Sequence, residues 1–380
     1  MTVAVDGRSL RRPLTGIGRY TYEMCAALAA EGCPLRIYVP GPRGIEVPAG
    51  VDLHCSNGLL PRIVWLQTVL PARLVRDGVR LLWGPSHRLP LTLAPRTIGV
   101  VTIHDLVWAY APETMHLRTY LGERLLMYPS LLRADAVVVD SAATAKALGE
   151  RFGALGKRIV TIYPGSTQLK AGGAGDASGL REHGIDRPYA LFVGTLEPRK
   201  NLPRLLEAYA LLAPEVRSRC MLVIVGGRGW RQGEEAVRQR IAKHNLENDV
   251  RLLDYVSDQT LAALYANSRF LVMPSLYEGF GFPVLEANLH GVPALIGNTS
   301  SLPEVGGAAA LPVDPLDVQS ISHGLWQMII DDTLRARLAA EAVDNAARFS
   351  WRTAARQLIG LFDELVGPKA TFRSSHPNAD

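Results

Sequence analysis

The sequence has few cysteines and no hydrophobic run long enough to cross a membrane. Its 380 residues include four cysteines, with no CxxC pair and no histidines at zinc-binding spacing, so neither a disulfide framework nor a structural zinc site is expected. No apolar stretch approaches the ~20 residues that span a bilayer, and the N-terminus lacks the basic and apolar regions of a signal peptide. We therefore expect a cytoplasmic protein, either soluble or peripheral on the cytoplasmic face of the inner membrane.

Several catalytic signatures are also absent from the sequence. It contains no Gly-x-Ser-x-Gly elbow, no Walker lysine motif and no HExxH, which excludes common forms of hydrolase, nucleotide triphosphatase and zinc protease. It also lacks an Asp-x-Asp pair that could hold a divalent cation between phosphates. Consequently, neither a metal nor another cofactor is expected.

Charge is unevenly distributed along the chain. The formal net charge is +5, and residues 1–168 contain 19 Lys and Arg against 12 Asp and Glu. A basic N-terminal half suits a nucleic acid, an anionic membrane or a phosphorylated substrate, or is simply a solvated surface. The excess of positive charge is modest, and no nucleic-acid partner is expected.

Hydrophobic residues make up 48% of the chain, and short β-branched runs alternate with segments of helical period. The expected strands are 3–5, 36–39, 80–83, 97–103, 136–139 and 158–162, then 189–193, 220–225, 250–253, 270–273, 294–296 and 310–313. The expected helices between them include 20–30, 202–212, 234–243, 258–266 and 334–347. This alternation predicts an α/β protein with doubly wound parallel sheets.

The two strand series predict two domains. The glycine-rich stretch 171–175 lies in the segment 165–187, which has little apolar periodicity and therefore indicates a linker. The predicted domains are 1–166 and 186–349, with a helix at about 350–366 and a tail at 367–380. Because ligands bind at the carboxyl ends of parallel strands, we expect a site in the cleft between the domains.

Glycine-rich loops follow the first expected strand of each domain. Gly16 and Gly18 precede the first helix, where they either let backbone amides approach a phosphate or serve only steric needs. In the second domain, Arg199 and Lys200 follow the strand at 189–193. These two cations either bind a diphosphate or belong to a solvated turn.

The densest constellation is residues 274–287. Glu278 lies in a glycine-rich loop and Glu286 in the first turn of a helix that opens at Pro283. Two carboxylates flanking backbone amides suit a polyol joined to a phosphate; alternatively, Glu286 only complements the helix dipole. Two aromatic residues of this loop, Phe280 and Phe282, are expected to be exposed.

A histidine follows the expected strand at 97–103. His104 either donates a hydrogen bond to a substrate or reacting hydroxyl or is structural. Asp105 is expected to brace the loop or the imidazole, and Asp140 with Ser141 to orient the same wall of the cleft.

Together these motifs resemble the retaining glycosyltransferases of family 4 (the GT4 type), which have the GT-B fold of two Rossmann-like domains. The resemblance spans nearly the whole chain. Its most specific part is residues 278–286, similar to the E-x7-E signature of the family. Further similar segments are 16–20, 104–105, 193–201, 303–307 and 349–351, the last at the start of a terminal helix that in this fold returns to the first domain.

The resemblance implies a role for each candidate residue. The implied catalytic residues are His104, Arg199, Lys200 and Glu278. The implied donor-binding residues are Gly16, Gly18, Tyr255, Val256, Gly279, Phe280, Gly281, Phe282, Pro283 and Glu286. Glu278 would hold the donor sugar, Glu286 the ribose, and the two cations the diphosphate, with Tyr255 and Val256 framing the nucleobase. Thr195 departs from those members that carry a basic residue directly after the strand-end glycine.

The implied activity is a metal-independent hexosyltransferase of surface polysaccharide or O-antigen biosynthesis, with GDP-mannose as the first choice of donor. Its partners would be a nucleotide-sugar and a saccharide or lipid-diphosphate-linked acceptor. Alternatives are a rhamnosyl- or other hexosyltransferase using a dTDP- or UDP-sugar, a nucleotide-sugar 2-epimerase of the same fold, and a non-catalytic nucleotide-binding module. No second carboxylate is identifiable as a nucleophile, which favours front-face displacement.

The segment 59–76 is apolar and basic. It is expected to form a pair of short helices, which either lie at a membrane interface or pack on the sheet. The second alternative is slightly favoured.

Overall fold

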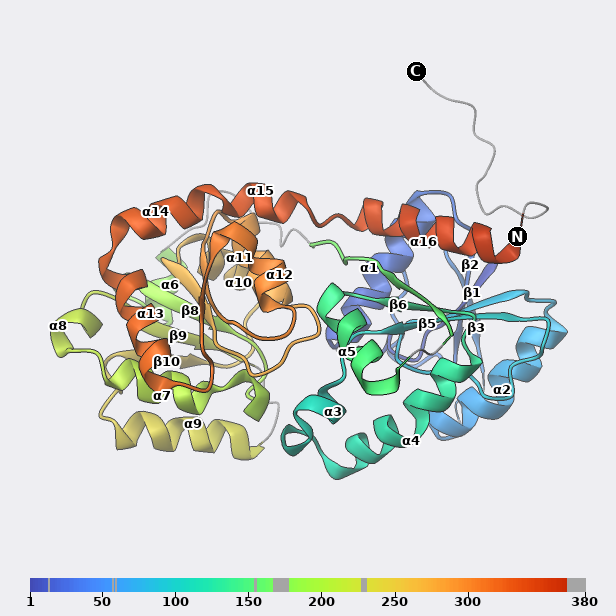
Figure 1. The fold of residues 1–380 in the computed structure, drawn as a ribbon, viewed down its shortest axis with the longest axis horizontal. Helices are drawn as coiled ribbons and strands as arrows, with labels where there is room; N and C mark the ends of the chain where they lie inside the picture. The colour runs from blue at the N-terminus through green and yellow to red at the C-terminus, as the bar shows by residue number, and fades with distance from the viewer. Residues whose placement is uncertain are drawn as a thin grey trace, which may run out of the picture. The chain divides into compact units, whose positions relative to one another are not determined.

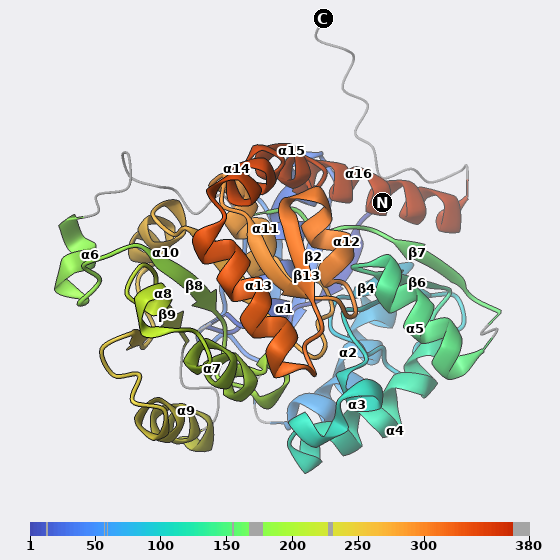
Figure 2. The ribbon, with the colours of Figure 1, turned by 60° about the vertical axis from the view of Figure 1, so that its left-hand side comes forward.

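The chain folds into two compact units (Figures 1 and 2). The computed structural model describes residues 1–12, 14–56, 58, 60–153, 156–166, 178–226 and 231–367. The N-terminal unit comprises Met1–Ala109, Met115–Gly165 and the chain from Phe349 onward, and the C-terminal unit comprises Tyr110–Thr114 and Ser166–Arg348. The glycine-rich stretch 171–175 and the tail beyond Gly367 lie outside the described residues.

A seven-stranded sheet forms the centre of the N-terminal unit. Its strands are β1 (Val3–Asp6), β2 (Leu35–Val39), β3 (Asp52–Cys55), β4 (Leu81–Gly84), β5 (Ile98–Ile103), β6 (Ala136–Val139) and β7 (Arg158–Thr161). They pair in parallel in the order β3-β2-β1-β4-β5-β6-β7. The direction of winding reverses between β1 and β4, which is where such sheets bind ligands.

Helices cover both faces of this sheet. They are α1 (Gly16–Ala30), α2 (Arg62–Arg76), α3 (Val107–Tyr110), α4 (Leu117–Arg133), α5 (Ala142–Phe152) and α16 (Trp351–Val366). The 3₁₀ turn η1 (Pro112–Thr114), between α3 and α4 in the chain, belongs to the C-terminal unit. α2, α4 and α5 share one hydrophobic core with the sheet. α1 and α16 contact each other on the opposite face (Figure 1), where Arg356 of α16 donates to Glu31 over 2.7 Å.

The C-terminal unit contains a second parallel sheet with the same winding. Its strands are β8 (Tyr189–Val193), β9 (Met221–Val225), β10 (Val250–Leu253), β11 (Phe270–Met273), β12 (Ala294–Gly297) and β13 (Ala310–Val313), in the order β10-β9-β8-β11-β12-β13. Its helices and turns are α6 (Ser178–Glu182), η2 (Pro198–Lys200), α7 (Leu202–Ala210), α8 (Pro214–Arg217), α9 (Arg231–Lys243), α10 (Asp258–Ala266), α11 (Phe282–Leu289), α12 (Leu302–Gly306), η3 (Gly307–Ala309), α13 (Val318–Ile330), α14 (Asp332–Ala340) and α15 (Ala342–Ala347).

Two α/β domains with doubly wound parallel sheets are thus confirmed, and every expected strand is present to within about two residues. β3 was not expected. It is a polar strand at the sheet edge, with Asp52 and Leu53 exposed, so it lacks the apolar run that marks a buried strand.

Three helix predictions need correction. The segment 59–76 contains one helix rather than two, because Pro71 lies within α2 and the buried Trp65, Leu70 and neighbouring side chains hold it against the core. This confirms the packing alternative for the apolar side of α2. The segment 334–347 is divided into α14 and α15 at Glu341. α1 begins at Gly16, whereas the helix was expected to begin at residue 20.

Among the described residues, no helix is long and apolar enough to cross a bilayer.

Candidate active site

The candidate site of the C-terminal unit is built at the point where its sheet changes winding direction. β8 and β11 are neighbours in the sheet although their last residues, Val193 and Met273, are 80 positions apart in the sequence. Both run in parallel, so the loops that follow them emerge side by side at one edge. This placement brings the Arg199–Lys200 segment and the Glu278 loop together.

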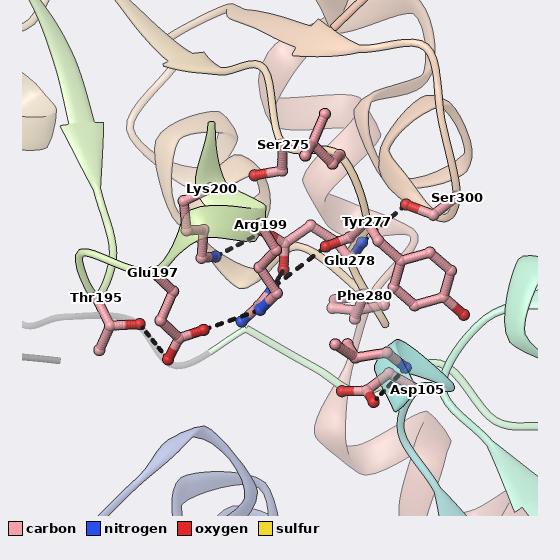
Figure 3. Close-up of polar contacts among 12 residues, drawn as sticks. Asp105, Thr195, Glu197, Arg199, Lys200, Ser275, Tyr277, Glu278, Phe280 and Ser300 are labelled. Atoms are coloured by element: carbon pink, nitrogen blue, oxygen red, sulfur yellow. Dashed lines mark hydrogen bonds and ion pairs between the residues drawn. The ribbon is translucent and has the colours of Figure 1, made fainter. Parts of the chain in front are cut away.

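Glu278 is the centre of the resulting cluster. Its Oε1 accepts a hydrogen bond from Lys200 Nζ at 2.7 Å, and its Oε2 accepts one from Arg199 at 2.6 Å. Figure 3 shows the three side chains pointing toward one another. Arg199 also pairs with Glu197 at 2.9 Å, and Thr195 donates to the same carboxylate at 2.9 Å. The structure therefore joins two motifs that the sequence presented separately.

Burial and the nearby charges shift the pKa values of this cluster. Glu278 and Lys200 are both buried, whereas Arg199 is partly exposed. Burial tends to raise the pKa of Glu278, but Arg199 and Lys200 outweigh it and hold that pKa at about 2. The pKa of Lys200 is lowered, because burial and the neighbouring Arg199 outweigh the attraction of Glu278. With Glu197 on Arg199, the cluster holds two cations and two carboxylates, and Glu278 is the carboxylate that the two cations share.

This arrangement predicts a pH dependence of stability. The pKa of Glu278 is about 2 in the folded chain, against roughly 4.3 in an unfolded one. Between these values the unfolded chain binds more protons, so the free energy of unfolding should fall as pH decreases from about 4.5 to about 2, by at most about 3 kcal/mol from this group. Denaturant unfolding of the wild type and Glu278→Gln across this range measures the effect. Parallel curves for the two proteins would contradict it.

The cations are positioned by the backbone of their loop. Gly194, at the end of β8, has φ +157, and a Cβ there would lie 3.3 Å from Lys200 Cε. Asn201 follows in the left-handed region at φ +63, and its side-chain amide donates to the carbonyls of Pro274 and Pro315. Leu276 N also donates to Arg199 O at 2.8 Å. The two loops are thus fixed to each other by main-chain contacts before any ligand binds.

Sequence reasoning missed Asn201 and three hydroxyl residues that hold the Glu278 loop. After β12, Ser300 Oγ accepts from Glu278 N at 2.9 Å, and Ser301 Oγ donates to the carbonyls of Glu278 and Phe280. Thr299 Oγ1 donates to the carbonyls of Ser275 and Leu276. Three consecutive hydroxyl residues, starting two positions after the end of β12, were the available signal.

The aromatic residues of the glycine-rich loop are not exposed as expected. Phe280 is buried and Phe282 half-buried, and their rings meet edge to face at 5.1 Å. The two rings therefore pack beneath the loop. α11 begins at Phe282, with Pro283 in its first turn and Gly281 as its N-cap.

Glu286 lies in α11 and is buried against α10. Its Oε2 accepts a hydrogen bond from the hydroxyl of buried Tyr265 at 2.7 Å, and the ring of Tyr265 stacks on His290. Glu286 thus has a specific partner in addition to its place near the helix N-terminus, so its orientation is set by packing rather than by the helix dipole alone.

Tyr255 and Val256 follow β10, the edge strand, which β9 separates from β8. Strands are about 4.8 Å apart, so the end of β10 lies about 10 Å from that of β8. The side chain of Tyr255 is exposed. The pair therefore does not join the Glu278 cluster, and lies at the same sheet edge two strands away.

In the N-terminal unit, Gly16 and Gly18 occupy the first turn of α1 rather than a preceding loop. Thr15 caps this turn by accepting from Gly18 N at 3.3 Å. A Cβ on Gly18 would lie 2.6 Å from the carbonyl of Ser9, whereas a Cβ on Gly16 would have no neighbour within 4 Å. Close packing therefore requires glycine at position 18 but not at position 16. The open space beside Gly16 leaves room for a ligand at the helix N-terminus.

His104 follows β5 and is buried. Its Nδ1 lies 2.5 Å from Asp140 Oδ2, and its Nε2 lies 2.8 Å from the carbonyl of Pro85. Burial tends to lower the pKa of His104, but Asp140 outweighs burial and raises it. Of the two roles expected for Asp105, the structure shows the first: Asp105 braces the loop by accepting from Val107 N. The imidazole is braced by Asp140, which directly follows the neighbouring strand β6.

Metal binding is not suggested by the described part of the chain, in which no three His, Cys, Asp or Glu side chains gather as potential ligands. The chemistry that the cluster does offer is electrostatic. Cations fixed before binding can stabilise charge that develops on an anionic leaving group, and a carboxylate beside them can accept hydrogen bonds from hydroxyls.

Comparison with known proteins places both units in glycosyltransferase families. A family model described as glycosyl transferases group 1 matches residues 180–344, and one described as glycosyltransferase family 4 matches residues 14–166. The O-antigen chain mannosyltransferase B of Escherichia coli is 33% identical, over 95% of this chain and 99% of that protein. The serotype-specific mannosyltransferase WbdA of Escherichia coli is 31% identical, over 70% of this chain and 33% of that protein.

Solved structures show the same fold. Sucrose-phosphate synthase from Thermosynechococcus elongatus matches with a TM-score of 0.77 and 21% identity, over 96% of this chain and 98% of that one. The two sheets, the family models and the full-length relative agree. The chain therefore belongs to glycosyltransferase family 4 and is a glycosyltransferase with the GT-B fold.

Proposed function

We propose that this glycosyltransferase moves mannose from GDP-mannose, with retention of configuration, to a saccharide of a surface polysaccharide or O-antigen. The observation that carries the proposal is the buried Glu278 held between Arg199 and Lys200, where two cations and a carboxylate suit a sugar diphosphate. The choice of mannose rests on the full-length relative, which is named as an O-antigen chain mannosyltransferase.

The cations act on the leaving group. As the bond between the sugar C1 and the diphosphate oxygen breaks, negative charge grows on the diphosphate. Both cations are already fixed by Glu278, and Arg199 also by the Tyr277 carbonyl and the Leu276 amide, so they stabilise this charge without reorganisation. Glu278 accepts hydrogen bonds from the sugar hydroxyls and keeps the pyranose beside the cations.

Retention follows from front-face displacement. The acceptor hydroxyl attacks C1 on the face that the diphosphate leaves, forming the new C1–O bond. Its proton passes to the departing phosphate oxygen, so charge and atoms balance without an enzyme nucleophile. Hydrolases that retain configuration need a second carboxylate about 5–5.5 Å from the first, and this mechanism does not.

Other residues are proposed to select the donor. Glu286, oriented by Tyr265, holds the ribose hydroxyls, and the exposed Tyr255 with Val256 frames the nucleobase. The amide of Gly16 contacts a phosphate, which accounts for a glycine that packing does not require. For His104 to contact the donor sugar, it must exchange its bond to the Pro85 carbonyl for one to a sugar hydroxyl.

A donor panel tests the proposal. UDP-, GDP- and dTDP-sugars are compared for thermal stabilisation and for acceptor-free hydrolysis, without and with EDTA. GDP and GDP-mannose should stabilise the protein, and only GDP-mannose should be hydrolysed. Preference for dTDP-rhamnose or a UDP-sugar would show that this nucleotide-sugar, and not GDP-mannose, is the donor. Interconversion of the sugar without hydrolysis would indicate a 2-epimerase. NMR of the transferred anomer then tests retention, and inversion would rule it out.

We further propose that the acceptor is a lipid-diphosphate-linked saccharide and that the chain works as a peripheral protein on the cytoplasmic face of the inner membrane. The basic N-terminal half and the O-antigen relative support this proposal.

A further inference from the structure

An exposed apolar stripe runs along α4. Leu117, Leu121, Leu125, Tyr128 and Leu132 are each 43 to 69% exposed. At about 100° per residue these five positions fall within about 80° of arc, and at 1.5 Å per residue they span about 22 Å. A continuous row of this kind is more than the scattered surface leucines that need no explanation.

The opposite face of α4 explains why the stripe is not core. Met127, Ser130 and Leu131 are buried and contribute to the packing against the sheet. One side of the helix therefore packs against the N-terminal unit, and the leucine row lies on the other side. In Figure 1, α4 lies along the outer side of the helical layer that covers this face of the sheet.

Charge identifies the surface that fits the stripe. Arg118 and Arg124 are exposed and flank the row on its two sides. α2 and α4 together carry six arginines and one acidic residue, Glu123, and Glu123 is already paired with Arg88 at 2.7 Å. Two such basic faces would repel each other, which disfavours a second copy of the chain as the occupant. An apolar row flanked by arginines is suited to an anionic bilayer surface.

We propose that α4, rather than the segment 59–76, docks this chain on anionic lipid, with the five apolar side chains inserted at the headgroup boundary. The apolar side of α2 is occupied by core packing, so α2 contributes mainly charge. The inference deepens the membrane contact proposed above and rests on it. Vesicle binding needs no donor, so its failure is distinguishable from failure of the proposed transferase activity.

Vesicle sedimentation of the full-length protein tests the proposal. Vesicles of phosphatidylcholine alone and with about one-third phosphatidylglycerol are compared for the wild type and for L117Q/L121Q/L125Q. The wild type should sediment with anionic vesicles and much less with neutral ones. The triple variant should lose at least tenfold in partition, and R118Q/R124Q should lose several-fold with a weaker dependence on salt.

The matched control is L211Q/L316Q/V343Q, which removes three exposed apolar side chains from the C-terminal unit and should bind like the wild type. Thermal melts and acceptor-free donor hydrolysis verify that each variant is folded. Unchanged partition of the α4 triple variant, or equal binding to neutral vesicles, would overturn the proposal. So would a wild-type dimer that the triple variant abolishes, because the stripe would then be covered by a second copy.

Discussion

Replacing Glu278 with glutamine is expected to lower turnover by about 10²-fold or more, the scale on which one fixed electrostatic group acts in a buried site. Glutamine keeps the size of the side chain but loses the charge that fixes Lys200 Nζ at 2.7 Å and Arg199 at 2.6 Å. Both cations then lose their fixed position, and the sugar hydroxyls lose an anionic acceptor. Because Arg199 and Lys200 are still present to bind the diphosphate, the loss of activity should appear mainly in kcat.

Glu197→Gln is the matched control for this variant. Glu197 also pairs with Arg199, at 2.9 Å, but it has no contact with Lys200 among the described hydrogen bonds. Its removal should change kcat less than tenfold. Steady-state kinetics of both variants, with thermal melts to verify folding, measure the difference. Equal kcat values for Glu278→Gln and the wild type would contradict the role given to Glu278.

Lys200→Met carries the second large expected effect. The ammonium is buried and contacts Glu278, so its removal leaves a buried carboxylate with Arg199 as its remaining cation in the cluster. Breaking a buried ion pair costs about 3–5 kcal/mol of stability in proteins. Affinity for a nucleoside diphosphate should fall by about 10²-fold, since a charge-assisted contact to phosphate is lost.

Lys243→Met, at an exposed position of α9, removes the same charge away from the cluster and should retain wild-type affinity. Calorimetric titration of the diphosphate nucleotide separates affinity from folding, because the fraction of folded protein is known from the melt. Wild-type affinity in folded Lys200→Met would show that the diphosphate does not bind at this lysine.

Much of the fold could be predicted from the sequence because its strands are buried on both faces. Such strands appear as short apolar runs, and β6, β8 and β11 begin and end where the pattern indicated. β3 is an edge strand with exposed polar residues, so it produced no such run. The segment 59–76 forms one helix instead of the expected two, because the burial of neighbouring side chains outweighs the hydrogen bond that Pro71 removes.

The site was predictable only as separate motifs. Arg199, Lys200 and Glu278 stood out by charge and by the glycines around them, but their pairing depends on β8 and β11 being neighbours. Asn201 and Ser301 act through backbone carbonyls distant in sequence, and such partners leave no local pattern. The glycines around Phe280 suggest an exposed loop residue, whereas the packing partner that buries it is set by the tertiary fold.

A crystal structure with a bound nucleotide-sugar tests the central claim most directly. The account predicts diphosphate oxygens within hydrogen-bond distance of Lys200 Nζ and the Arg199 guanidinium, with a sugar hydroxyl on the Glu278 carboxylate. A diphosphate bound elsewhere, with Lys200 and Glu278 still paired only to each other, would contradict it.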